Sequence, residues 1–302
     1  MSNQTNKINF NKAPKTIEEQ IELLKSRGLI IQDEAKAKYL LQHISYYRLS
    51  GYWFAFYENF ETKQFQANTT FELVFHLYCF DQKLRKLLLS EIEKIEISLR
   101  SQISNYMINK KQDPFWFLNV SYFTNKDNYE QFVEVLKVDF KRSDEQFINS
   151  FKKKYSDELP PSWIILEITS FGTLSKIFKN INNYDKKQIS SVYQLPEKVF
   201  ESWLHSIVYI RNVCAHHTRL WNRNISIKPE KLKKPRLDWV NNEYNNNKIY
   251  SIVLVIQYLL KTIYPHSDFF ERLKSLLEKY PDVEPKNIGF INDWENEPIW
   301  QK

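Results

Sequence analysis

Glycine and cysteine are scarce in this chain, and each scarcity excludes a class of protein. Only 4 of the 302 residues are glycine, whereas an average chain contains roughly 7 %. Turn-rich β-sandwiches and barrels need more, and the four glycines lie too far apart for a phosphate-binding loop of the GxGxxG type. Two cysteines, Cys79 and Cys214, cannot supply a disulfide framework or a four-cysteine zinc site.

Long apolar runs are also missing from the sequence. The most apolar segment, residues 249–263, includes Gln257 and Lys261 and is shorter than the roughly 20 apolar residues of a membrane-spanning helix. Residues 1–15 are polar and lack the apolar core of a secretion signal. We therefore expect a cytoplasmic protein that has no membrane partner.

Helical signals extend over almost the whole chain. Capping residues predict helices over residues 16–28 and 33–47. A T-x-x-E box at Thr69 is followed by no glycine or proline before Pro114, which predicts one helix of about 35 residues. The aromatic segment 52–65 fits either a short β-hairpin or an extended loop.

The second half of the chain also shows helical periodicity. The predicted helices are residues 127–142 and 143–155 as a hairpin, 172–181, 196–221, and 249–264 with 267–279 as a final pair. The sequence therefore predicts an all-α fold, a helical bundle with an N-terminal helical appendage. The predicted domains are 1–66, 67–280 with an inserted helical hairpin at about 114–160, and an irregular tail at 281–302.

The positive charge of the chain is concentrated in one stretch. The net charge is +7, and the segment 202–237 contains eight basic residues and one acidic residue, which account for all of it. A local basic field indicates a polyanionic partner, with nucleic acid as the first candidate. The same pattern also fits a solvated surface rich in lysine. The candidate RNA-binding residues are Arg219, Arg223, Lys228, Lys231, Lys233, Lys234 and Arg236.

A cluster of polar side chains accompanies the apolar stripe of the helix predicted over 196–221. Arg211, Asn212 and His216 fall beside the stripe, and His217 falls on it, where a histidine is more often buried than catalytic. Asn212 and His216 are four residues apart and share a face, whereas Arg211 and His216 lie about 140° apart on an ideal helix. A long arginine side chain can bridge that separation.

These residue types suit the cleavage of RNA without a metal or other cofactor. Histidine can accept and donate a proton near neutral pH, and arginine offers a planar set of donors to phosphate oxygens. A base removes the 2′-OH proton, and cationic donors stabilise the charge that develops as the 2′-oxygen attacks phosphorus. The same residues also fit polar positions at the edge of a core helix, satisfied by their neighbours.

The string from Arg211 to His216 resembles the R-x4-6-H motif of HEPN-superfamily ribonucleases. The chain also resembles the abortive-infection (Abi) family of the AbiD/AbiF type over most of its length. The stretches that carry this resemblance are Tyr46–Tyr52, Asp81–Arg85 with Ile95–Arg100, Pro161–Trp163, Ser170–Leu174, and the motif helix with Arg219–Asn222.

This resemblance implies an α-helical bundle that pairs as a homodimer through the motif helix and forms a composite cleft. It implies a metal-independent endoribonuclease of phage defence or of a toxin–antitoxin system, with Arg211 and His216 catalytic and Asn212 supporting them. Glu96 and Arg100 on the long helix are weaker candidates that we expect to face the motif. RNA is the implied partner, either as substrate or as a bound structured non-coding RNA.

A second function remains open at this level. HEPN proteins without activity exist, so the chain also fits a non-catalytic RNA-binding protein, a ribonucleoprotein component that uses the same basic surface. Degradation of RNA in the presence of EDTA favours the enzyme. Salt-sensitive binding without any product favours the binding protein.

Overall fold

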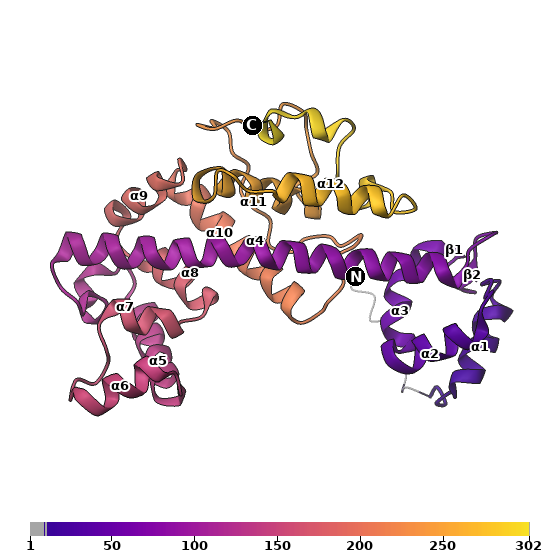
Figure 1. Ribbon diagram of the computed structural model, residues 1–302, viewed down its shortest axis with the longest axis horizontal. Helices are drawn as coiled ribbons and strands as arrows, with labels where there is room; N and C mark the ends of the chain where they lie inside the picture. The colour runs from indigo at the N-terminus through magenta and orange to yellow at the C-terminus, as the bar shows by residue number, and fades with distance from the viewer. Residues whose placement is uncertain (1–8, 10, 302) are drawn as a thin grey trace, which may run out of the picture. The chain divides into compact units, whose positions relative to one another are not determined.

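The structure, a computed structural model, describes residue 9 and residues 11–301 (Figure 1). Its fold is all-α, as the sequence predicts, and the described part of the chain contains a single two-stranded sheet. The chain divides into two compact units, Met1–Phe80 and Asp81–Lys302. The division falls inside helix α4 (Phe71–Lys111), and each unit is described by itself.

The first unit consists of short helices that bury aromatic and aliphatic side chains. Its elements are α1 (Ile17–Ser26), α2 (Glu34–Ile44), α3 (Tyr46–Trp53), η1 (Phe54–Phe56), the hairpin of β1 (Tyr57–Asn59) with β2 (Gln64–Phe65), and the start of α4. Trp53 is fully buried, and Tyr52 packs edge-on against Tyr78 of α4. The aromatic segment is therefore part helix and part hairpin.

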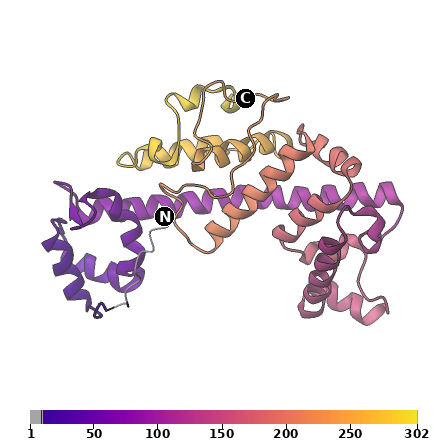
Figure 2. The ribbon, with the colours of Figure 1, turned by 180° about the vertical axis from the view of Figure 1, so that it is seen from behind.

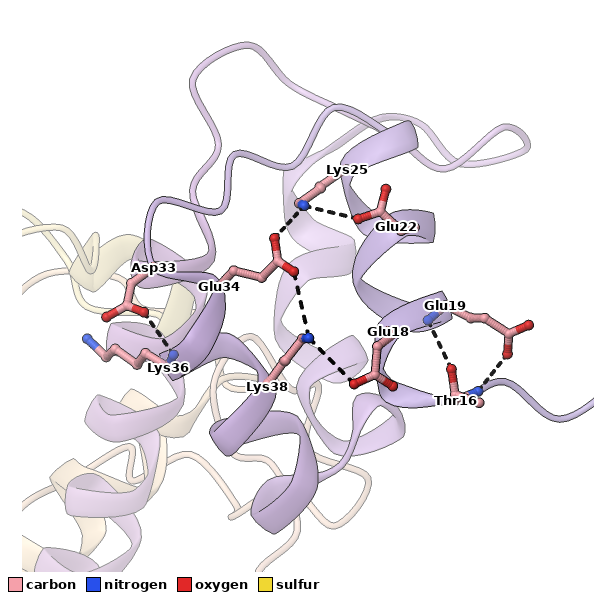
Figure 3. Close-up of polar contacts among 9 residues, drawn as sticks. All are labelled: Thr16, Glu18, Glu19, Glu22, Lys25, Asp33, Glu34, Lys36 and Lys38. Carbon is pink, nitrogen blue, oxygen red and sulfur yellow. Dashed lines mark hydrogen bonds and ion pairs between the residues drawn. The ribbon is translucent and has the colours of Figure 1, made fainter.

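Two lysines connect α1 and α2 through ion pairs. The Nζ of Lys25 lies 2.6 Å from a carboxylate oxygen of Glu34 and 3.0 Å from one of Glu22 (Figure 3). Lys38 similarly approaches Glu18 at 3.5 Å and Glu34 at 3.9 Å. The side chains of all five residues are at least one-third exposed, so water screens these pairs and they add little to stability.

The second unit contains the remaining helices. These are the rest of α4, α5 (Lys126–Arg142), α6 (Gln146–Lys154), α7 (Ser162–Ile165), α8 (Phe171–Asn180), α9 (Asn183–Val192), α10 (Glu197–Ala215), α11 (Ile249–Ile263) and α12 (Phe269–Lys279). Short 3₁₀ turns lie at Trp116–Leu118, Val120–Tyr122, Leu166–Ile168, Pro285–Ile288, Trp294–Asn296 and Pro298–Trp300. Helix α10 packs against α8, α9 and α11 (Figures 1 and 2).

Helix α4 is tied to its neighbours in this unit by polar contacts. The hydroxyl of Ser98 lies 3.0 Å from that of Tyr193, which follows α9. Buried Asp185 of α9 accepts a hydrogen bond from Tyr106 at 2.8 Å and pairs with Lys111 at 2.7 Å. Arg272 of α12 pairs with the fully buried Glu91. These contacts join α4 to α9 and α12.

Several helix boundaries differ from the sequence prediction. Helix α2 ends at Ile44, and α10 ends at Ala215 rather than near residue 221. The N-terminus of α4 is capped by the Oγ1 of Thr70, which accepts from the backbone N–H of Leu73, and not by Thr69. Helix α9 was not predicted, because most of its residues are polar and its buried face is too short to give a clear apolar periodicity.

Over the part of the chain that the structure describes, no helix is both long enough and apolar enough to cross a membrane. Helix α11, the most apolar segment, is a core helix whose residues from Ile249 to Ile256 are all buried.

Candidate functional site

The motif lies at the C-terminus of α10, where the helix ends in a Schellman motif. The backbone N–H of Thr218 donates to the carbonyl of Val213 at 2.9 Å, and that of His217 donates to Cys214 at 3.0 Å. His217 takes the left-handed position with φ of 55°, a position usually filled by glycine. The stop signal is therefore carried by a histidine, which is why sequence patterns predicted a longer helix.

A buried carboxylate holds the chain directly after this helix end. Asp81 of α4 is fully buried and accepts from the backbone N–H of Trp221 at 2.7 Å and of Leu220 at 3.1 Å. The same carboxylate pairs with Arg85, one turn along α4, which is also buried. Two stretches that carried the resemblance are thereby joined, and the segment that follows His216 is anchored to α4.

Arg211 and Asn212 lie in the last two turns of α10, and His216 is the C-cap residue of this helix. The Nη1 of Arg211 donates to the side-chain oxygen of Asn212 at 3.2 Å. The backbone N–H of His216 donates to the carbonyl of Asn212 at 3.0 Å, so His216 lies one helical turn below Asn212. The side chains of Asn212 and His216 are exposed and Arg211 is partly exposed. All three can therefore meet a ligand in solution.

Glu96 and Arg100 of α4 belong to the same neighbourhood. Burial raises the pKa of the Glu96 carboxyl, while the positive charges of Arg100 and Arg211 act in the opposite direction. Arg100 donates to Glu96 at 3.1 Å and to the backbone carbonyl of Thr169 at 3.0 Å. Arg100 thus ties α4 to the turn before α8, and Glu96 supplies a partly buried negative charge near Arg211.

His217 does not have the buried position that a continuous helix predicts for it, whereas Cys214 does. His217 is exposed rather than part of the buried stripe, because the helix has already ended. Cys214 is buried, and burial, together with the charge of Asp81, raises the pKa of its thiol to about 12. Cys214 is therefore a packing residue and not a nucleophile.

Some of the basic residues beyond the motif contact other parts of the protein, and others have exposed side chains. Arg223 donates to the hydroxyl of Tyr209 and to the carbonyl of Arg219, both at 3.1 Å, so it stabilises the loop. The Nζ of Lys231 lies 6.0 Å from the ring centre of Tyr244. The side chains of the remaining candidates in the loop are exposed: Lys228, Lys233, Lys234 and Arg236.

A groove of about 760 Å³ lies between α8 and α10 and reaches the motif at Asn212. Its polar lining includes Lys176 and Lys179 of α8 and Lys198 and His205 of α10. The backbone at Glu230 forms one edge, because its N–H donates to Ser202 of α10 at 2.9 Å and its carbonyl accepts from Trp203 at 2.8 Å. The basic loop, residues 219–236, therefore passes the rim of this groove at Glu230.

The sequence profile of the family described as "Abi-like protein" matches residues 39–222. The chain belongs to the Abi-like protein family. The matched region begins in α2 and ends just after the motif, so this Abi-like chain carries Arg211, Asn212 and His216 inside the family region. No curated protein and no solved structure gave a significant match. Membership in this family indicates a function in abortive infection.

Two features of the Abi-like site were not assigned from the sequence. Asp81 lies in a stretch that carries the family resemblance. Its hydrogen-bond partners, Leu220 and Trp221, are about 140 residues away in the sequence, so no local pattern predicts these contacts. The groove lysines were also missed, since α8 is short and its cationic side chains look like ordinary surface residues. His205 offered a usable signal, because it lies seven residues before Asn212 and therefore on nearly the same helix face.

Proposed function

We propose that this Abi-like protein is a metal-independent endoribonuclease of the HEPN type that acts in abortive infection or as a toxin. The observation that carries the proposal is the placement of Arg211, Asn212 and His216 together at an accessible helix end. A guanidinium and an imidazole in such a place can both reach a phosphodiester. Had they been sealed in the core, no strand could have approached them.

In the proposed reaction His216 transfers protons and Arg211 stabilises the developing negative charge. An imidazole removes the proton of a ribose 2′-OH, the 2′-oxygen attacks the adjacent phosphorus, and the 5′-oxygen of the next nucleotide leaves after gaining a proton. The products are a 2′,3′-cyclic phosphate and a 5′-hydroxyl end. Arg211 stabilises the extra charge of the transition state, and Asn212 orients the guanidinium through its 3.2 Å contact.

Pairing of two copies is part of the proposal. One motif provides one histidine, whereas the reaction needs a proton acceptor and a proton donor. A two-fold axis through the motif end of α10 provides both. We therefore propose a homodimer through this helix, with RNA as the substrate and a structured non-coding RNA as a further partner.

Cleavage of labelled RNA in EDTA tests the activity. We expect the intact protein to give cyclic-phosphate ends, and Arg211→Ala and His216→Ala to reduce the rate by about a hundredfold or more, the usual contribution of acid–base catalysis. His217→Asn is the matched control, because it removes the neighbouring exposed imidazole and asparagine tolerates the left-handed backbone. Undiminished cleavage by the double variant of Arg211 and His216 would refute the nuclease proposal.

The exposed lysines of the basic loop favour the second candidate, a non-catalytic RNA-binding protein. In that case RNA binding weakens steeply with salt, and no product forms at any protein concentration. Variants of Arg211 and His216 then leave cellular toxicity unchanged.

A further inference from the structure

We propose that the groove between α8 and α10 binds a single-stranded stretch of RNA beside the cleaved phosphodiester, with Lys176, Lys179 and Lys198 contacting its phosphates. This inference rests on the proposed ribonuclease function, because it assigns the substrate path to the same site. It assigns a binding role to residues outside both the motif and the basic loop.

The position of the groove relative to the motif is the first argument. Asn212 lies at one end of the lining, and its side chain contacts the guanidinium of Arg211. His205 lies two helical turns before Asn212, in the same lining. A strand whose scissile phosphate lies at Arg211 and His216 can therefore continue directly along this hollow.

The charge and shape of the groove are the second argument. The side chains of Lys176, Lys179 and Lys198 are exposed, and lysine ammonium groups are common phosphate contacts. A smaller hollow of about 380 Å³ continues on the other side of Lys176 and Lys179, where Phe132 and Val135 of α5 add apolar surface. Cationic groups beside apolar walls suit a strand with both phosphates and bases, as in other single-strand binding grooves.

The acidic residues at the groove leave room for such a ligand. Glu201 pairs with the largely buried Lys186 at 3.4 Å and with the exposed Lys179 at 3.6 Å. A phosphate can compete with Glu201 for the exposed Lys179 at little cost. Glu230 is exposed at the rim, where its charge opposes an anionic strand. Removing the Glu230 charge should therefore strengthen RNA binding, whereas removing the lysine charges should weaken it.

The closing experiment measures the affinity of a fluorescein-labelled, unstructured oligouridylate for the full chain over a range of salt concentrations. All proteins carry His216→Ala, so that the probe stays intact. We expect the triple variant Lys176→Gln, Lys179→Gln and Lys198→Gln to weaken binding about tenfold or more, and to reduce the salt slope by about 2, or about 0.7 for each lost phosphate contact. Glu230→Gln should tighten binding.

A matched control carries the same loss of charge elsewhere: Lys126→Gln, Lys153→Gln and Lys286→Gln, none of which lines either hollow. An equal loss of affinity in the control and groove variants would overturn the groove proposal, and so would an unchanged affinity in the groove variant. Groove-dependent binding, together with an absence of cleavage by the protein that retains His216, would overturn the nuclease proposal alone. Absence of any RNA binding by the parent protein would overturn both.

Discussion

Removal of the Asp81 carboxylate is expected to destabilise the second unit more than any exposed substitution. Asp81 is fully buried and its partner Arg85 retains only 4 % of its exposure. Loss of one member of a buried ion pair costs about 3–5 kcal/mol, because the buried charge that remains loses this partner. The N–H groups of Leu220 and Trp221 also lose their acceptor, at about 1–3 kcal/mol each. These costs overlap, so we expect a total of at least about 4 kcal/mol for Asp81→Ala.

Urea unfolding followed by circular dichroism measures this effect. Asp81→Asn keeps one acceptor oxygen but loses the charge, so it should cost less than Asp81→Ala. In a double-mutant cycle with Arg85→Met, the coupling free energy should be about 2–3 kcal/mol, the upper part of the range for residues in direct contact.

Asp268→Ala is the matched control for this prediction. Asp268 also precedes its arginine partner, Arg272, by four residues, but it is exposed, and its loss should cost less than about 1 kcal/mol. A cost below about 1 kcal/mol for Asp81→Ala, or a coupling near zero, would refute the assignment of Asp81 as the anchor of the segment after the motif helix.

Three further predictions concern the same region. His217→Gly should stabilise the protein by about 1 kcal/mol, since it relieves the left-handed strain; a lower urea midpoint would contradict this. In a Cys79→Ser background, Cys214 should resist a thiol reagent until the protein unfolds, because its thiol is buried and its pKa is raised to about 12; rapid labelling of native protein would contradict this. Because burial raises the pKa of Glu96, the stability contribution of this carboxyl falls as the pH rises above 4.5 through the raised value. Glu96→Gln should therefore remove a decline in stability over that range, and an unchanged pH profile of the unfolding free energy would show that Glu96 is not the cause.

The sequence was sufficient for the fold class and for most helices, because their periodicity and capping residues are local. The capping box of Thr16 and Glu19 is present, and the hairpin of α5 and α6 lies where it was predicted. The end of α10 was not predictable in the same way. Its signal is a left-handed His217 together with backbone contacts to Asp81, which stands 139 residues before Leu220.

The candidate site shows the same division between local and distant information. The grouping of Arg211, Asn212 and His216 follows from their spacing on one helix. The closeness of Glu96 to Arg211 could only be expected from the resemblance, since it depends on how α4 packs against α10. The catalytic roles of these residues stay predictions until the cleavage experiments are made.

The shortage of glycine has a consequence for the unfolded chain. Among the residues that the structure describes, eight other than glycine hold a positive φ: Ser45, Lys63, Asn68, Gln112, Gln194, His217, Asn222 and Asp293. Asn68, Asn222 and Asp293 tolerate this backbone conformation, whereas the other five residues carry some strain in the native state. A chain in which nearly every residue has a Cβ atom, however, samples fewer backbone conformations before it folds and loses less entropy on folding. The strained turns and the restricted unfolded ensemble are thus two effects of one composition, and they act on stability in opposite directions.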